Sequence, residues 1–283
     1  MNLDQLAEHY RLCGESLRES DRDRWLACLF APDAARPHLF ALYAFNAEVA
    51  RIRDQVSQPI LGEMRLQWWI DALNAADAGA TAGQFRSHPT ADALLATIER
   101  FGLPEKALLD YLEARRFDLY DDPAPDQAFL ELYCDETCGA LFSLASQILG
   151  AGGAEEAARH AGRAYALAGL LRALPWQVAR GQCFLPGDLL ARRGLTAADL
   201  FAREKSAGLM VALAELRALA RDNLVKAKQA VLSLPKPGRE AFRLLALPGL
   251  YLRQMERRDY DPFTTPVDAA PWRRQWALWR NKV

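Results

Sequence analysis

The sequence has little of several features that mark particular protein classes. Its five cysteines are an odd number spread over 283 residues, which argues against a disulfide framework. Glycine (17) and proline (15) are too scarce for a fibrous or disordered chain. No apolar run reaches the roughly 18 residues of a membrane-spanning helix. Basic and acidic residues nearly balance, at 35 and 36, so we expect no nucleic-acid partner.

Two further scarcities bear on location and chemistry. Residues 1–24 are polar and contain no apolar signal core, so we expect a cytoplasmic protein, at most peripheral at the inner face of the membrane. Cys134 and Cys138 have no companion pair at metal-finger spacing, so no zinc site is expected. Only six of the 35 basic residues are lysine, and the remaining positive charge is guanidinium, which suits anions and carboxylates.

Alanine is abundant instead, with 50 residues, and helical periodicity dominates. The clearest stripe has steps of three or four residues and consists of Leu209, Leu213, Leu216, Ala220, Leu224, Ala227 and Val231. Similar patterns predict helices over about 35–54, 129–148, 155–180, 238–257 and 270–281, with helix starts at Pro89 and Pro104. No strand pattern with period two is present. We predict an all-α fold, with one domain over residues 1–283.

Three helical regions carry polar groups among apolar ones: residues 45–54, 114–118 and 170–177. One interpretation is a solvated helix face with intrahelical ion pairs, for example between Glu48 and Arg51. The other is a functional site. No Ser/His/Asp set is visible, and the four histidines receive no role.

The segments ALYAF-x-x-EV (41–49), FLP (184–186) and ERRDYDPF (256–263) occur in the order typical of the squalene/phytoene synthase family, which this sequence resembles. The resemblance implies an α-helical isoprenoid-synthase domain around a central cavity. Family enzymes condense two prenyl diphosphates, which Mg²⁺ ions hold on two Asp-x-x-x-Asp motifs. Aspartates four apart share a helix face, and Mg²⁺ prefers carboxylate and phosphate oxygens.

The acidic motifs depart from the family pattern. Ala50 and Asp54 occupy the first motif, and Ala173 and Gln177 occupy the second. Asp54 is therefore the one remaining metal-ligand candidate. We expect no cofactor, and Mg²⁺ only if the protein is an active enzyme; no catalytic residue is assigned.

Other residues resemble one branch of the family more closely. Phe45-Asn46-x-Glu48, Met64-Arg65-x-Gln67-x-Trp69 and Leu171-Arg172-Ala173-x-Pro175-Trp176 are similar to the branch that contains the mitochondrial assembly factor of respiratory complex I and its bacterial relatives. This resemblance implies a non-catalytic assembly or interaction factor with a protein partner, such as subunits of complex I.

Two alternatives stay open. The chain could be a prenyltransferase with a rewired site, or a protein that binds a prenyl or quinone-like lipid, unless tryptophans 68, 69 and 176 fill the cavity. In the first case arginines would hold diphosphate; otherwise the same arginines neutralise the remaining acids. The candidate ligand-binding residues of the cavity are Asn46, Glu48, Arg51, Arg53, Asp54, Arg116, Asp118, Arg172 and Gln177.

The C-terminal segment APWRRQWALWRNKV places Trp272, Trp276 and Trp279 on one stripe edged by arginines. Such a stripe can lie on a membrane surface or pack against the helical body. The sequence predicts one of these two placements and does not choose between them.

Overall fold

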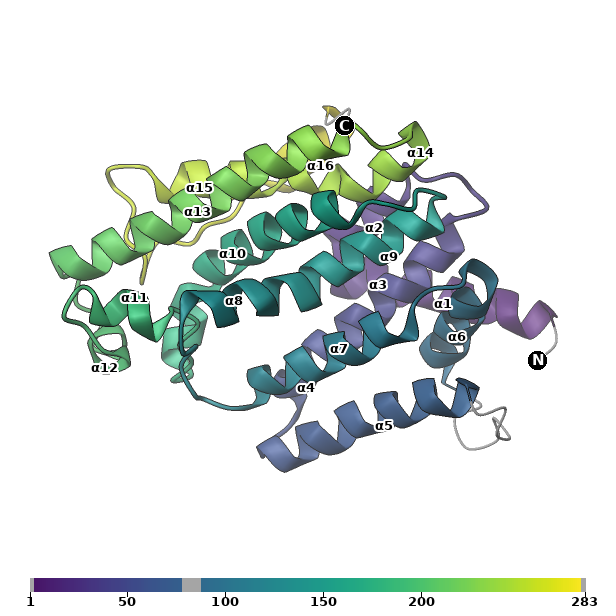
Figure 1. Ribbon diagram of the computed structural model, residues 1–283, viewed down its shortest axis with the longest axis horizontal. Coiled ribbons are helices and arrows are strands. Elements are labelled where there is room, and N and C mark those ends of the chain that lie inside the picture. Colours follow the sequence, from purple (N-terminus) through teal and green to yellow (C-terminus); the bar gives the residue numbers. More distant parts are fainter. Residues whose placement is uncertain (1–2, 78–87, 281–283) are drawn as a thin grey trace. The chain divides into compact units, whose positions relative to one another are not determined.

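The alanine- and leucine-rich stripes of the sequence form helices, which short loops connect (Figure 1). This computed structural model describes residues 3–77 and 88–280, and within those ranges there are helices and loops but no strand. The predicted all-α fold class is therefore confirmed. Contacts group the chain into two compact units, and the prediction of one domain over 1–283 stays a prediction.

Unit 1 comprises the chain up to Leu119 together with Ser143–Ala154 and Leu234–Ala241. Helices α1, α3 and α6 pack against one another in its core, and α5 packs against α7. Helix α6 begins at Pro89, as predicted. The elements of unit 1 are α1 (Leu3–Ser20), α2 (Arg22–Cys28), α3 (Arg36–Ala50), α4 (Ile52–Gln55), α5 (Pro59–Asp77), α6 (Pro89–Phe101), α7 (Glu105–Arg115), the 3₁₀ turn η1 (Arg116–Leu119) and α14 (Lys236–Arg239).

Unit 2 comprises Tyr120–Phe142, Glu155–Ser233 and the chain from Phe242 onward. Its elements are α8 (Gln127–Cys134), the π-helical turn η2 (Asp135–Gly139), α10 (Glu155–Ala179), α11 (Gly187–Ala191), α12 (Ala197–Phe201), α13 (Ala207–Val231), α15 (Pro248–Met255) and α16 (Pro271–Arg280). Two further elements, α9 (Ala140–Ile148) and the 3₁₀ helix η3 (Glu240–Ala246), have residues in both units.

The long helices α10 and α13 run side by side and form the centre of unit 2 (Figure 1). All seven apolar positions of the stripe predicted over 209–231 are buried, which confirms the periodicity. Where α10 meets η2, a Cβ atom on Gly162 would lie 2.4 Å from the backbone nitrogen of Gly139. The crossing therefore requires glycine, because no side chain fits between the two backbones.

The structure corrects the continuous helix predicted over 35–54. Helix α3 ends at Ala50, and a separate short helix, α4, begins at Ile52. The Arg51 N–H donates to the Glu48 carbonyl at 3.3 Å, three residues back, so the last turn of α3 is tightened and the helix ends there. Ala50 and Asp54 consequently lie on different helices, and the shared face of an unbroken Asp-x-x-x-Asp helix does not exist here.

Two other expectations need smaller changes. The helix predicted over 238–257 is divided among α14, η3 and α15. Helix α14 ends at Arg239, and Pro248 begins α15, because proline is tolerated in the first turn of a helix but not in its interior. The region predicted over 129–148 is helical throughout but contains the π-helical turn η2. All five cysteines are free. None of the described helices has both the length and the apolar character needed to cross a bilayer.

Candidate functional site

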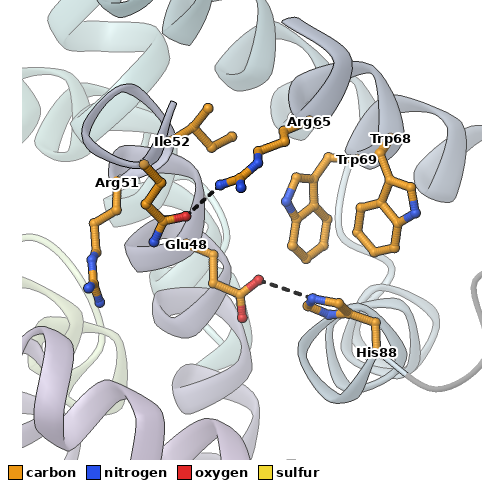
Figure 2. Close-up of a pocket in the computed structure, with 8 residues that line it drawn as sticks. Glu48, Arg51, Ile52, Arg65, Trp68, Trp69 and His88 are labelled. Atoms are coloured by element: carbon orange, nitrogen blue, oxygen red, sulfur yellow. Dashed lines mark hydrogen bonds and ion pairs between the residues drawn. The ribbon is translucent and has the colours of Figure 1, made fainter. Parts of the chain in front are cut away.

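A pocket of about 390 Å³ opens in unit 1 beside the end of α3 (Figure 2). We call it the Glu48 pocket. Its lining residues are Glu48, Arg51, Ile52, Gln55, Arg65, Trp68, Trp69 and His88. A volume of this size suits a small ligand, and the mixture of aromatic rings with a few charged groups is typical of binding sites.

Four elements build the Glu48 pocket. Glu48 lies in the last turn of α3, and the break after Ala50 places Arg51 at the rim. Helix α5 contributes Arg65, Trp68 and Trp69, whose spacing of three and four residues keeps them on one face. His88 caps the N-terminus of α6, where its Nδ1 accepts from the backbone N–H of residue 91.

The Glu48 carboxylate is the central polar group of this pocket. The Thr90 hydroxyl donates to its Oε1 at 2.5 Å, and His88 Nε2 lies 3.5 Å from its Oε2. Burial raises the pKa of Glu48 above the ordinary value of a glutamate, although the Thr90 hydrogen bond and the charge of His88 act in the opposite direction. The carboxyl group can therefore hold or release a proton closer to neutrality than an exposed glutamate can.

Aromatic rings form one wall of the pocket. The Trp68 and Trp69 rings meet edge to face at 5.0 Å, and the His88 ring lies 4.9 Å from Trp68. Trp69 is buried and packs on Phe45 at 4.9 Å, so this ring belongs to the core. Trp68 is half-buried and offers its ring to the pocket, as Figure 2 shows.

Guanidinium groups lie on the other side of the pocket. Arg65 donates from Nη1 to Gln55 Oε1 at 2.6 Å, which ties α5 to α4. Arg51 is exposed, and its guanidinium points away from Arg65 (Figure 2). The two arginines therefore do not form one clamp around a single diphosphate in this conformation.

Asn46 and Asp118 belong to a separate polar chain inside unit 1. Tyr111 donates from its hydroxyl to Asn46 Oδ1 at 2.9 Å, and Arg115 Nε donates to the same hydroxyl at 3.2 Å. Arg115 also donates from Nη1 to Asp118 Oδ2 at 2.9 Å. Asp118 thus pairs with Arg115, and this chain of buried and half-buried groups joins α3, α7 and η1.

Three further candidates, Arg53, Asp54 and Arg116, lie elsewhere on unit 1. Arg53 is half-buried and Asp54 is exposed, both on α4. Arg116 pairs with Glu113 at 2.8 Å and lies 4.0 Å from Glu63. None of these three arginine and aspartate candidates lines the Glu48 pocket.

Arg172, in unit 2, is engaged by its own surroundings. Its Nε donates to the Val267 carbonyl at 2.8 Å, and its Nη2 lies 3.5 Å from Asp268. The guanidinium carbon stands 4.7 Å from the centre of the Tyr251 ring. Arg172 therefore fastens the segment before α16 to α10.

Gln177 is also enclosed within unit 2. The residue is only 7% exposed, and its Oε1 accepts no hydrogen bond from any residue that the structure describes. It borders a cavity of about 10 Å³, lined otherwise by Leu130, Leu167, Leu170, Leu171, Phe184, Leu185 and Leu216. Such a cavity has room for about one water molecule. A prenyl chain does not fit there.

The structure thus sorts the sequence candidates into separate places. It brings Glu48 and Arg51 into one pocket and joins Asn46 to Asp118 through Tyr111 and Arg115. Sequence reasoning missed His88 and Thr90 as neighbours of Glu48. Its one available signal was the His-Pro-Thr helix start at 88–90. Trp176, considered as a cavity plug, is 57% exposed and is not a core residue.

The donor set at the two motif positions does not fit the metal site of the family. Ala50, Ala173 and Gln177 offer no carboxylate, and Asp54 lies on its own short helix. Across residues 3–77 and 88–280, no three histidine, cysteine, aspartate or glutamate side chains gather closely enough to hold a metal ion.

Comparisons with known proteins agree with the family resemblance of the sequence and with the helical fold. Residues 17–280 match the squalene/phytoene synthase family. Over 253 residues the chain is 29% identical to mouse "NADH dehydrogenase (ubiquinone) complex I, assembly factor 6". The aligned region covers 89% of this chain and 75% of the mouse protein. It is also 29% identical over 178 residues to presqualene diphosphate synthase of Rhodopseudomonas palustris, 62% of each chain. The crystal structure of squalene synthase HpnC from Alicyclobacillus acidocaldarius superposes with a TM-score of 0.81 at 23% identity, covering 93% of this chain and 98% of that one.

Proposed function

We propose, since the chain belongs to the squalene/phytoene synthase family, that it is a non-catalytic member which acts as an assembly factor for respiratory complex I. The observation that carries the proposal is the state of the second motif. Where the family places Mg²⁺-binding carboxylates, this chain has Ala173 and a Gln177 side chain enclosed by leucines. A neutral amide supplies no negative charge to a cation, and the apolar enclosure of about 10 Å³ leaves no room for a hydrated ion beside it.

The assembly role itself is supported by similarity. The mouse protein named as a complex I assembly factor covers 89% of this chain, against 62% for the presqualene diphosphate synthase, at the same identity. Partners would then be subunits of complex I. Their binding would use the surface of the helical fold, since the proposal needs no turnover.

Incubation with Mg²⁺ and farnesyl or geranylgeranyl diphosphate tests the absence of catalysis. We expect no release of pyrophosphate, while an active presqualene diphosphate synthase under the same conditions serves as the positive control. Turnover that disappears in an Asp54→Ala variant would contradict the proposal and establish a prenyltransferase with a rewired site.

Deletion of the coding sequence in its source cell tests the assembly role. We expect membranes of the deletion strain to lose most NADH:ubiquinone oxidoreductase activity and the assembled complex on native gels. Succinate oxidation should stay unchanged as the control. Normal complex I in the deletion strain would rule the role out.

The Glu48 pocket favours one second candidate, binding of a quinone-like lipid. Its volume of about 390 Å³ accepts a single ring, and Trp68 and His88 provide flat surfaces beside a carboxyl group. Titration with a short-chain quinone should quench tryptophan fluorescence, and Trp68→Ala should weaken this quenching. Equal quenching in that variant and in Trp25→Ala would exclude the pocket as the site.

A further inference from the structure

Helix α16 exposes three tryptophans on one face. Trp272, Trp276 and Trp279 are 63%, 53% and 59% exposed. Their spacing of four and three residues places them within an arc of about 60° around the helix axis. Large apolar rings are rarely left in water in this number, so the face is available for another surface.

The opposite side of α16 attaches the helix to unit 2. Leu278 is fully buried, and its carbonyl accepts a hydrogen bond from Arg243 Nη1 at 2.7 Å. Just before the helix, Val267 and Ala269 are buried, and Arg172 holds the Val267 carbonyl at 2.8 Å. This attachment fixes the rotation of α16, and the tryptophan face points away from the body that holds it.

The charge of the face has one sign. Arg273 and Arg280 are exposed and lie along one edge of the stripe. Their guanidinium carbons are 5.2 Å from the Trp272 ring centre and 6.0 Å from the Trp276 ring centre. The helix contains no acidic residue. A surface that complements α16 must therefore accept indole rings and supply negative charge.

We propose that α16 docks onto the headgroup region of a bilayer that contains anionic lipids. Indole rings prefer the boundary between headgroups and acyl chains, and exposed arginines beside them can contact lipid phosphates. The tryptophan face is convex, because it is the exposed side of a single helix. A lipid surface can deform around such a face. The proposal goes beyond the assembly role and does not depend on it.

Vesicle flotation tests this proposal with the full-length chain. We compare vesicles of phosphatidylcholine alone with vesicles that also contain phosphatidylglycerol. The wild type should float with the anionic vesicles at low salt, its tryptophan emission should shift to shorter wavelength, and high salt should weaken binding. Absence of binding to anionic vesicles, or equal binding to both kinds, would overturn the proposal.

Substitutions then locate the contact. The triple variant Trp272→Ala, Trp276→Ala and Trp279→Ala should lower the vesicle association constant by about tenfold or more, since each buried ring contributes substantially. Trp176→Ala is the matched control, because Trp176 is equally exposed, at 57%, but lies on α10. Arg273→Glu with Arg280→Glu should remove the preference for anionic vesicles. Circular dichroism checks that every variant is folded.

The main competing occupant of the face is a second copy of the chain. Light scattering of the wild type and the triple variant separates the two cases. A wild-type dimer that becomes monomeric in the triple variant, without vesicle binding by either protein, would overturn the proposal. Loss of vesicle binding with an unchanged oligomeric state would support it.

Discussion

The two regions that correspond to the acidic motifs of the family differ in structure in this chain. Around the first, in unit 1, the helix is broken at Arg51, and an open pocket is lined by the titratable Glu48. Around the second, in unit 2, α10 continues to Ala179 and its polar side chains are engaged or enclosed. Arg172 fastens a distant segment, and Gln177 faces leucines.

This difference separates binding potential from packing. The first region keeps space, charge and a perturbed carboxyl group, which are the properties of a site that can take a ligand. The second region contributes to stability, so substitutions there should change unfolding more than binding.

Gly162→Ala should destabilise the protein by about 3 kcal/mol or more, because its new methyl group would collide with the backbone of Gly139. Gly169→Ala, on the same helix, is the matched control. Beyond the backbone of its own helix and its chain neighbours, no described atom lies within 4 Å of a Cβ at Gly169, so the change should stabilise by about 0.5–1 kcal/mol. Urea unfolding measures both. Equal effects of the two substitutions would show that α10 is not tightly packed at Gly162.

Arg172→Ala should cost about 1–2 kcal/mol, because the buried residue Val267 loses the donor to its carbonyl. Arg51→Ala, at the corresponding place of the other region, should change stability by less than about 0.5 kcal/mol since Arg51 is exposed. Thermal and urea unfolding provide the measurement. If Arg51→Ala proved the more costly change, the division between the two regions would be wrong.

Gln177→Leu should stabilise unit 2 by about 1 kcal/mol. The change replaces an enclosed carbonyl oxygen, which has no donor among the described residues, with an apolar side chain of similar length. Gln55→Leu in the Glu48 pocket is the control. Gln55 is exposed and accepts from Arg65, so no gain is expected there. A loss of stability in Gln177→Leu would indicate that a polar group in this enclosure is needed.

The fold class was predictable because periodicity determines which faces of a helix are buried. The stripe over 209–231 shows this at every position. The break at Arg51 was not predictable from the apolar pattern. Val49 before the break and Ile52 after it keep the spacing of one helix, and both are buried. The tightened turn is defined by the backbone hydrogen bond from Arg51 to Glu48, which the side-chain pattern does not reveal.

The site was predictable only in part, for a related reason. Glu48 stood out as a charge within an apolar helix, but its neighbours come from a segment some 40 residues later in the chain, where His88 and Thr90 begin α6. No local pattern links such residues. The pairing of Asp118 with Arg115 likewise depends on the 3₁₀ turn that follows α7.

The smallest expected effect is the pH dependence of Glu48→Gln. Burial raises the folded-state pKa of Glu48 above the unfolded value, so its contribution to stability is fully present below the unfolded pKa and is lost as pH rises through the folded pKa. Glutamine is neutral at every pH and escapes that loss. The variant should therefore melt close to the wild type near pH 4 and a few degrees higher at pH 7.

Scanning calorimetry at both pH values measures this difference, with Glu99→Gln on the exposed side of α6 as the control. His88 faces the same carboxyl group and carries charge only when protonated, so the comparison is repeated in a His88→Asn background. The charge of His88 lowers the pKa of Glu48, so the asparagine background should raise that pKa further and enlarge the gain of Glu48→Gln. If Glu48→Gln were less stable than the wild type at pH 7, the charged carboxylate would support the fold. The Glu48 pocket would then serve stability, as the region around Arg172 and Gln177 does.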